Sequence, residues 1–316
     1  MNDKKYKIII DTDPGVDDSI CLIYAFFDKN IDIQLISTVV GNVEVETGTR
    51  NTLHLLDILG VSYPVAKGEN NPLYRERIDA KFIHQEQGLG GYIPPEKAIH
   101  KPIAENAVDA LYRVISQGDG DIIPVVLGPH TNIAKLITKY PSVVSKIPKI
   151  VFMGGSPFGH PNYPDHISFN ISSDPEAFKI VLDTKIPLVM APSDLGRRKA
   201  HLTENYVCGL KNYGDIGKLM CIMYSMYWEP KFADRRIATN DICAMLSLVY
   251  PEMFTFEKCF VTVNTTDAPG KTVCEFSPEG NVELVTNVDR DAFINHLNYE
   301  LENFPKIKID LTKQKI

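Results

Sequence analysis

The sequence predicts an α/β protein with an open, mostly parallel sheet covered by helices on both faces, followed by extra C-terminal helices and a β-hairpin. Up to residue 194, short runs rich in β-branched residues alternate with longer segments of helical periodicity. The short runs are apolar throughout, which is typical of strands that are buried on both faces of a parallel sheet. Several of them end in a polar turn, where open α/β sheets place their ligand sites.

The first part of the chain contains five such strands and four helical segments. The predicted strands are residues 7–10, 33–40, 121–128, 148–155 and 186–194. The predicted helices are residues 19–27, 48–60, 131–140 and 174–183. Residues 67–101 lack a clear periodicity and contain the glycine-rich stretch FIHQEQGLGGYIPP. A long loop of this kind is either a functional segment beside a site or a surface excursion, and the sequence leaves both interpretations open.

The pattern changes after residue 200. Helical stretches are predicted over residues 203–212, 215–228 and 240–250, and a final helix over residues 289–304. Residues 259–276 and 281–288 predict strands arranged in a hairpin. Because no linker-like composition and no internal repeat interrupts the chain, we expect a single domain over residues 1–316.

Composition and charge restrict the function classes. The chain has 316 residues and a net charge of -7, without a long basic run, so we expect neither nucleic acid nor an anionic membrane as a partner. No apolar stretch reaches the length of a membrane span or of a signal peptide, which predicts a cytoplasmic protein. The six cysteines form no CxxC pair and lie mostly in apolar runs, so we expect buried free thiols in a reducing compartment.

Four aspartates crowd the segment IIIDTDPGVDD, at positions 11, 13, 17 and 18. The helix that follows favours nearby negative charge by only about 0.3–1 kcal/mol per group, which is too little to hold several buried carboxylates together. Either some of them are protonated or a cation lies among them. Because the nearby donors are oxygens, Ca²⁺ or Mg²⁺ is favoured. In the alternative, structural interpretation, Asp18 caps the helix, Asp17 faces solvent and Asp11 pairs with an arginine.

This segment resembles the N-terminal signature of the inosine–uridine-type nucleoside hydrolases, a family of calcium-dependent ribonucleoside N-ribohydrolases. Five further blocks follow in the same order as in that family: VVGN at 39–42, LGPHTNIA at 127–134, MGG at 153–155, FNISSDPEA at 169–177 and ND at 240–241. The resemblance spans most of the chain. It implies a Rossmann-like sheet, hydrolysis of a ribonucleoside to free base and ribose in nucleoside salvage, and a homodimer or homotetramer.

The resemblance also implies which residues hold the metal and the substrate. The carboxylates of Asp13, Asp18 and Asp241 and the carbonyl of Leu127 would bind one Ca²⁺, and Asp13 would be the general base that activates a calcium-bound water. The implied substrate contacts are Asp17, Asn42 and Asn170 at the ribose diol, Met153 in the sugar pocket and Asn162 near the 5′ end.

Two positions depart from the family pattern. Ser168 stands where the family usually has a glutamate that contacts the 5′-hydroxyl, and Asn240 stands where a histidine is often the proposed leaving-group acid. Both positions belong to substrate contacts. We therefore hypothesise that Ser168 relaxes recognition of the 5′ end, that Asn240 changes the recognised base, and that the substrate is a modified or non-standard nucleoside.

Other residues are candidates to replace the missing acid or to hold the base. His84 lies in the glycine-rich loop, where the family often has a loop histidine, and is our candidate catalytic acid; a solvent-exposed histidine is the alternative. His160 and His166 precede Ser168. Trp228, with Tyr224 and Tyr227, forms an aromatic segment that could stack on a base, although aromatic residues at helical spacing more often belong to a core.

Two other function classes fit parts of the sequence. A calcium-dependent nucleoside- or ribose-binding protein would keep the sugar site without the acid. A haloacid-dehalogenase-type phosphohydrolase also places DxD after its first strand, but it uses Mg²⁺ and an aspartyl nucleophile, and Pro14-Gly15 and the later Asn-containing blocks have no role in that chemistry.

Overall fold

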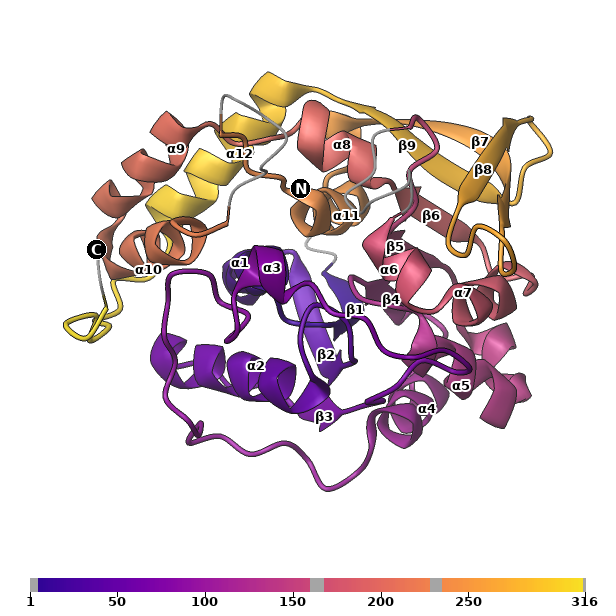
Figure 1. Cartoon of the computed structure of the whole chain (residues 1–316), viewed down its shortest axis with the longest axis horizontal. Coiled ribbons are helices and arrows are strands. Elements are labelled where there is room, and N and C mark those ends of the chain that lie inside the picture. The colour runs from indigo at the N-terminus through magenta and orange to yellow at the C-terminus, as the bar shows by residue number, and fades with distance from the viewer. Residues whose placement is uncertain (1–4, 160–167, 228–234, 315–316) are drawn as a thin grey trace.

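The computed structural model describes residues 5–159, 168–227 and 235–314. These residues form a nine-stranded sheet in the order β3-β2-β1-β4-β5-β6-β9-β7-β8 (Figure 1). The strands are β1 (Tyr6–Thr12), β2 (Ile31–Thr38), β3 (Val65–Lys67), β4 (Ile123–Val126), β5 (Ile150–Met153), β6 (Leu188–Ala191), β7 (Phe254–Val263), β8 (Thr272–Phe276) and β9 (Val282–Val288). Each pairing from β3 through β9 is parallel, and β7 pairs antiparallel with both β9 and β8. The predicted mostly parallel sheet is confirmed.

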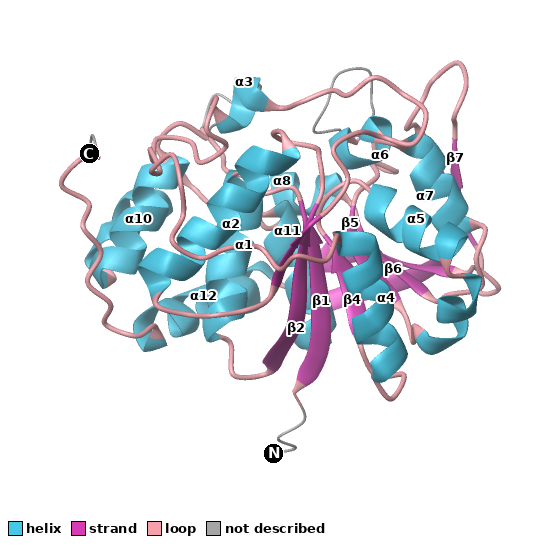
Figure 2. Cartoon of the chain, turned by 90° about the horizontal axis from the view of Figure 1, so that it is seen from below, coloured by secondary structure: helices cyan, strands magenta, loops and turns pink. Residues whose placement is uncertain are grey.

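Helices cover both faces of this sheet, as Figure 2 shows with the strands between two helical layers. The helices are α1 (Val16–Phe27), α2 (Val45–Leu59), α3 (Lys81–His84), α4 (Ala107–Gln117), α5 (Thr131–Lys139), α6 (Phe169–Ser173), α7 (Pro175–Leu182), α8 (Ser193–Arg198), α9 (Glu204–Gly209), α10 (Gly214–Tyr224), α11 (Asn240–Val249) and α12 (Arg290–Asn303). Ile8 and Ile10 of β1 pack into the core of α1, α2 and α10–α12, whereas Ile9 packs into the core of α4, α5 and α7. This alternation explains the continuous apolar run of β1, because both of its faces are buried.

The C-terminal strands are antiparallel neighbours, as the predicted hairpin requires. The hairpin is formed by β7 and β8, and β9 lies between β6 and β7. The side chains explain this order. Val282 and Leu284 of β9 are fully buried in an interior position, whereas Val273 and Phe276 of the edge strand β8 are about half exposed.

Some elements have other bounds than predicted. The helix expected over residues 215–228 ends at Tyr224. The short strand β3 and the helix α4 were not expected. All six cysteines are free as predicted, but only three are buried, and Cys208 is exposed. No described helix is long and apolar enough to cross a bilayer.

Candidate active site

The carboxyl ends of the parallel strands meet at one edge of the sheet, where a cavity opens. The turn after β1 and the start of α1 form its floor, and the start of α11 lies beside α1 (Figure 1). The site residues predicted from the sequence that line this cavity are Asp17, Asp18, Asn42, His84, Leu127, Met153, Asn170, Asn240 and Asp241. Segments that are far apart in the sequence are thus brought together, as the ends of parallel strands predicted.

Asp18 is the hydrogen-bonded centre of the turn after β1. Pro14 and Gly15 reverse the chain, and α1 begins at the next residue. The Asp18 carboxylate accepts hydrogen bonds from Thr12 Oγ1 at 2.5 Å, from the Asp13 and Gly15 backbone N–H groups at 3.2 Å each, and from Asn42 Nδ2 at 2.9 Å. Four donors therefore fix the position of this carboxylate. Asp18 does cap the helix, as the structural interpretation expected, and it also lines the cavity.

Asp13 is enclosed behind the same turn. Its Oδ2 accepts the Asn42 backbone N–H at 2.8 Å, and its Oδ1 has no hydrogen-bond partner. A Cβ atom at Gly41 would lie 1.9 Å from Asp13 Oδ2, and one at Gly128 would lie 2.8 Å from Oδ1, so only glycine fits at both positions. Burial, followed by the neighbouring Asp18 charge, raises the pKa of Asp13 well above its usual value.

Three other carboxylates converge in the cavity. Asp17, Asp18 and Asp241 each offer an oxygen, and these oxygens lie within 4.8 Å of one another. Burial and then the Asp18 charge raise the pKa of Asp17 to about 7, and burial with the charges of Asp17, Asp18 and Asp13 raises that of Asp241 well above its usual value. Buried carboxylates at this spacing need protons or a cation.

The donor set fits a hard cation. Every group that converges here offers oxygen, which suits Ca²⁺ or Mg²⁺. Asp13 Oδ1 and Asp17 Oδ1 are buried without a hydrogen-bond partner, as expected of oxygens that await a ligand. Asp13 lies outside the group of three that share the 4.8 Å spacing. The predicted interpretation of Asp17 as a solvent-facing residue is wrong, because Asp17 is 6% exposed.

Asp11 supports the site from the sheet. It is fully buried, and its Oδ1 accepts hydrogen bonds from Ser37 Oγ at 2.5 Å and from Asn132 Nδ2 at 2.8 Å. The alternative interpretation expected Asp11 to pair with an arginine, but its partners are a serine hydroxyl and an asparagine amide. Burial raises the pKa of Asp11 to about 7, against the lowering effect of these two hydrogen bonds.

The opposite wall is formed where β4 and β5 end. Asn170, at the start of α6, donates its amide to the Leu127 carbonyl and lies 3.3 Å from Met153 Sδ. Leu127, Met153 and Asn170 therefore form one contact group on this wall. The Leu127 carbonyl has a second lone pair, which leaves it capacity for one more partner.

His84 is held in the cavity wall by backbone contacts. It is 5% exposed, its Nδ1 accepts the Val16 N–H at 2.9 Å, and its ring lies 5.1 Å from that of Tyr227. Burial lowers the pKa of His84 to about 3, so the ring is neutral at neutral pH. The predicted position of His84 in the site is thus found, but in the uncharged state, in which it is a poor acid.

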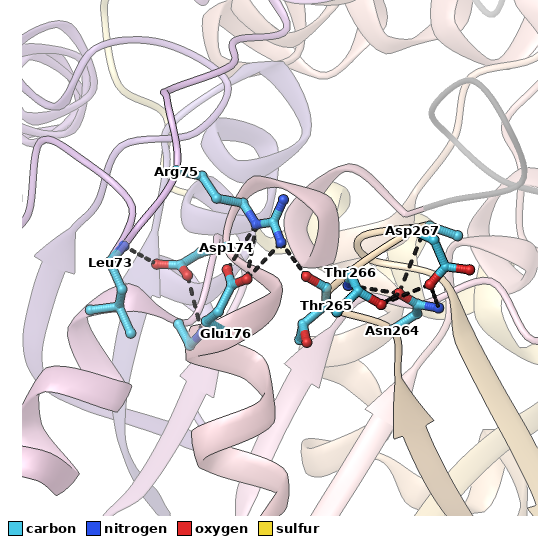
Figure 3. A network of polar contacts seen from close by, with 10 residues as sticks. Leu73, Arg75, Asp174, Glu176, Asn264, Thr265, Thr266 and Asp267 are labelled. Atoms are coloured by element: carbon cyan, nitrogen blue, oxygen red, sulfur yellow. Dashed lines mark hydrogen bonds and ion pairs between the residues drawn. The ribbon is translucent and has the colours of Figure 1, made fainter.

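The loop that carries His84 is tied to the rest of the molecule at several points. Figure 3 shows Arg75 beside Glu176 at the start of α7, with Arg75 Nε 2.8 Å from Glu176 Oε2. Arg75 also donates to the Thr265 carbonyl in the β7–β8 turn at 2.5 Å. Further along, Lys81 forms an ion pair with Glu44 at 2.9 Å. These ties place residues 80–84 over the cavity instead of leaving them as a free surface excursion.

The two departures from the family pattern differ in their surroundings. Asn240 lines the cavity at the first position of α11, and its Oδ1 is buried without a partner. A Cβ atom at Gly196 would lie 2.5 Å from that oxygen, so the glycine leaves room for the amide. Ser168 is fully buried, its Oγ has no hydrogen-bond partner, and it is not part of the cavity lining.

Other candidates are placed elsewhere or lie outside the described residues. His160, Asn162, His166 and Trp228 lie outside the described residues. Tyr224 is a fully buried core residue, whereas Tyr227 lines the cavity. Phe82 and Phe169 also line it, and sequence reasoning missed both; Phe169 adjoins Asn170 in the FN block, but Phe82 lies in a loop without periodicity.

The chain was compared with known proteins. The sequence profile described as inosine-uridine preferring nucleoside hydrolase matches residues 8–295. The non-specific ribonucleoside hydrolase RihC of Klebsiella pneumoniae subsp. pneumoniae is 36% identical over 292 residues, which cover 90% of this chain and 95% of the relative. RihC of Salmonella enteritidis PT4 is 35% identical over 292 residues, covering 90% of this chain and 94% of the relative.

Solved structures agree with the sequence relatives. The purine-preferring ribonucleoside hydrolase from Gardnerella vaginalis superposes with a TM-score of 0.88 at 27% identity, covering 95% of this chain and 99% of that one. The plant nucleoside hydrolase PpNRh1 superposes with a TM-score of 0.86 at 28% identity, covering 94% and 99%. A family of this chemistry is at odds with the phosphohydrolase alternative. The profile match and the curated relatives show that the chain belongs to the inosine-uridine preferring nucleoside hydrolase family, a family of hydrolases that act on N-glycosyl bonds.

Proposed function

We propose that this chain is a calcium-dependent N-ribohydrolase that cleaves a ribonucleoside to free base and ribose. The observation that carries the proposal is the group of buried carboxylates at the floor of the cavity, with two oxygens that have no hydrogen-bond partner. Asp13, Asp18 and Asp241, with the Leu127 carbonyl, would hold the cation. When bound, Ca²⁺ would neutralise these carboxylates, hold the vicinal diol of the ribose and polarise a water molecule.

The side chains around the cation position would orient the sugar. Asp17 Oδ1 has no partner in this structure and is a ready acceptor for a ribose hydroxyl. Asn42 and Asn170 carry amides on either side of the floor, and the Met153 thioether forms an apolar wall. Together they would fix the ribose with its C1′ atom above the carboxylates. Asn162, outside the described residues, would contact the 5′ end.

Asp13 is the proposed general base. It would take a proton from the attacking water, because its Oδ1 is free of hydrogen bonds while its Oδ2 is fixed by the Asn42 N–H. Cleavage develops positive charge at C1′, and the surrounding carboxylates stabilise that charge. His84 is the proposed contact to the leaving base, with Trp228 as a stacking partner outside the described residues.

Further proposals follow from the resemblance. Ser168 and Asn240 would shift the substrate toward a modified or non-standard nucleoside, and the unpartnered Asn240 Oδ1 supports a direct contact with the base. Ser168, outside the lining, would act near the 5′ end. We also propose a homodimer or homotetramer, a cytoplasmic location and a single domain.

Chromatography of free bases tests the proposed reaction. Purified protein is incubated with a panel of ordinary and modified ribonucleosides, with Ca²⁺ and after chelation. Release of base that depends on Ca²⁺ is expected. Calorimetric binding of a nucleoside without any release of base over hours would instead support the calcium-dependent binding protein. Matched Ser168→Glu and Asn240→His variants test the substrate hypothesis, which fails if neither variant changes the ranking of substrates.

A further inference from the structure

The charge around the cavity is one-sided. Asp17, Asp18 and Asp241 line it, and Asp13 is buried in the same turn. Among the described residues that line the cavity there is no lysine or arginine. These four carboxyl groups outnumber the two charges that a divalent cation would bring, so the lining stays acidic in composition with such a cation bound. A negative, partly desolvated cavity attracts a cationic ligand more strongly than a neutral one of the same shape.

An exposed aromatic ring lies at the rim of this cavity. Phe82 is 65% exposed although it is a large apolar side chain, and it lines the cavity. Its neighbours on α3 are fixed, because Lys81 pairs with Glu44 and His84 accepts the Val16 N–H. The ring is therefore held at the opening, where its face could cover a flat base. Aromatic faces attract cations as well as apolar rings.

The described residues near the base position offer no ready proton donor. His84 Nδ1 accepts a backbone N–H, so a proton on that nitrogen would face another N–H group. Asn240 carries a carboxamide, which does not release a proton at neutral pH. The Tyr227 hydroxyl is hydrogen-bonded to Asp17. A base that must be protonated before it leaves would therefore depart slowly from this site.

Building on the proposed N-ribohydrolase function, we propose that this site prefers ribonucleosides whose base already carries a positive charge in the ring bonded to C1′. N-ribosylpyridinium compounds and N7-alkylated purine ribonucleosides belong to this class. Three observations carry the inference: the acidic lining, the exposed Phe82 and the engaged Nδ1 of His84.

The reaction balances without an acid. The C1′–N bond breaks, and its electron pair stays on the ring nitrogen, which turns the cationic base into a neutral molecule. A water oxygen bonds to C1′, and the proton that water loses passes to Asp13 and then to solvent. The products are ribose, the neutral base and one proton.

Initial rates test the preference. The probes are N-ribosylnicotinamide as the cation, and uridine and inosine as neutral substrates, with Ca²⁺ present. The value of kcat/KM for the cation is expected to exceed those for uridine and inosine by about 100-fold or more, the usual size of an acid's contribution. The neutral C-riboside in which carbon replaces the ring nitrogen is expected to inhibit with a KI at least about 10-fold above the KM of the cation.

A pair of variants tests whether the protein itself favours the cationic base or whether the cationic nucleoside is only more reactive. Phe82→Leu keeps the apolar contact but removes the aromatic face, and it is expected to raise the KM of the cation by about 2- to 5-fold. Tyr74→Leu is the matched control, because Tyr74 is 79% exposed in the same loop but does not line the cavity. Its KM for the cation should stay at the wild-type value.

Each outcome decides between the two proposals. If uridine or inosine is cleaved within about 10-fold of the cation, or if the neutral C-riboside binds as tightly as the cation, the preference is refuted while the proposed function stands. If no nucleoside in the panel releases its base, the proposed function fails and this inference falls with it.

Discussion

On its sheet side the cavity contains the carboxylates of the turn after β1, among which Asp18 is fixed by several hydrogen bonds, whereas its loop side consists of residues held by a few long-range ties. Asp18 accepts from three donors in the turn after β1 and from Asn42. On the loop side Phe82 is mostly exposed, and at the first position of α11 Asn240 leaves its Oδ1 without a partner. Most of the residues proposed to hold the ribose and the cation belong to the first region, and His84 and Phe82, which are proposed to contact the base, belong to the second.

The two sides of the cavity differ in how well they tolerate substitution. A substitution on the sheet side leaves buried donors or charges without partners, so it costs a large part of the function. A substitution on the loop side changes contacts with a ligand and few contacts within the protein. The proposed base contacts can therefore change while the proposed metal and sugar contacts stay the same.

The largest effect is expected on the sheet side. Asp13→Asn removes the proposed base, so kcat should fall by about 10²- to 10⁴-fold. Chromatographic measurement of released base checks this result. The control is Asp119→Asn, which makes the same change of charge at an exposed position away from the cavity. An Asp13→Asn variant with wild-type turnover would show that this carboxylate is not the base.

Removal of calcium is expected to lower stability by a smaller but clear amount. A cation that binds only the folded chain stabilises it by about 2.7 kcal/mol when its concentration is 100 times its Kd. Thermal unfolding in CaCl2 and in chelator measures this difference as a shift in Tm. In Asp241→Asn the shift should nearly vanish. Equal Tm values for the wild type with and without Ca²⁺ would contradict a cation held by the folded site.

The third prediction concerns His130, a buried histidine of the core. Its ring is fully buried at the N-cap of α5 between Phe152 and Phe178, and neither ring nitrogen has a hydrogen-bond partner. Although His130 occupies the N-cap position of α5, its side chain makes no cap hydrogen bond. His130→Leu removes two unsatisfied polar atoms, so it should stabilise the protein by about 1–3 kcal/mol at pH 7 in urea unfolding.

The stabilisation expected from His130→Leu depends on pH. Burial lowers the pKa of His130 from 6.5 to about 3, so below pH 6.5 the unfolded chain binds a proton that the folded chain does not. The free energy of unfolding of the protein with His130 therefore decreases as the pH falls from 6.5 toward 3. The advantage of His130→Leu should grow by about 2 kcal/mol between pH 7 and pH 5. A constant difference across this range would mean that the imidazole is solvated or paired in solution.

The smallest effect is expected from the ties of the loop. Arg75→Gln breaks the half-buried pair with Glu176 and should destabilise the protein by about 1 kcal/mol. Glu176→Gln is the matched variant, and the double variant should cost less than the sum of the two, because both changes remove the same contact. Additive losses in urea unfolding would show that the two side chains do not stabilise each other.

The sequence predicted the sheet side well for a physical reason. Asp13, Asp17 and Asp18 are close in the sequence and follow a buried strand, so a local pattern already places them together. The parallel strands, with apolar residues on both faces, could be recognised in the same way. The order of the edge strands could not, because the position of β9 between β6 and β7 depends on which faces are buried.

The loop side was predicted only in part. His84 was identified through the resemblance, but its hydrogen bond from the Val16 N–H joins residues 68 positions apart and leaves no local pattern. Phe82 was missed because residues 67–101 have no periodicity that would assign a face to a side chain. Tyr227 was named only as a member of an aromatic segment, and its place in the cavity depends on how α10 packs.

A crystal structure of the protein grown with Ca²⁺ would show whether the buried carboxylates hold a cation. We expect one density peak among Asp13, Asp18, Asp241 and the Leu127 carbonyl, too strong for water, with six to eight oxygens at about 2.3–2.6 Å. A well-resolved map at millimolar Ca²⁺ that shows only water between these carboxylates would contradict it.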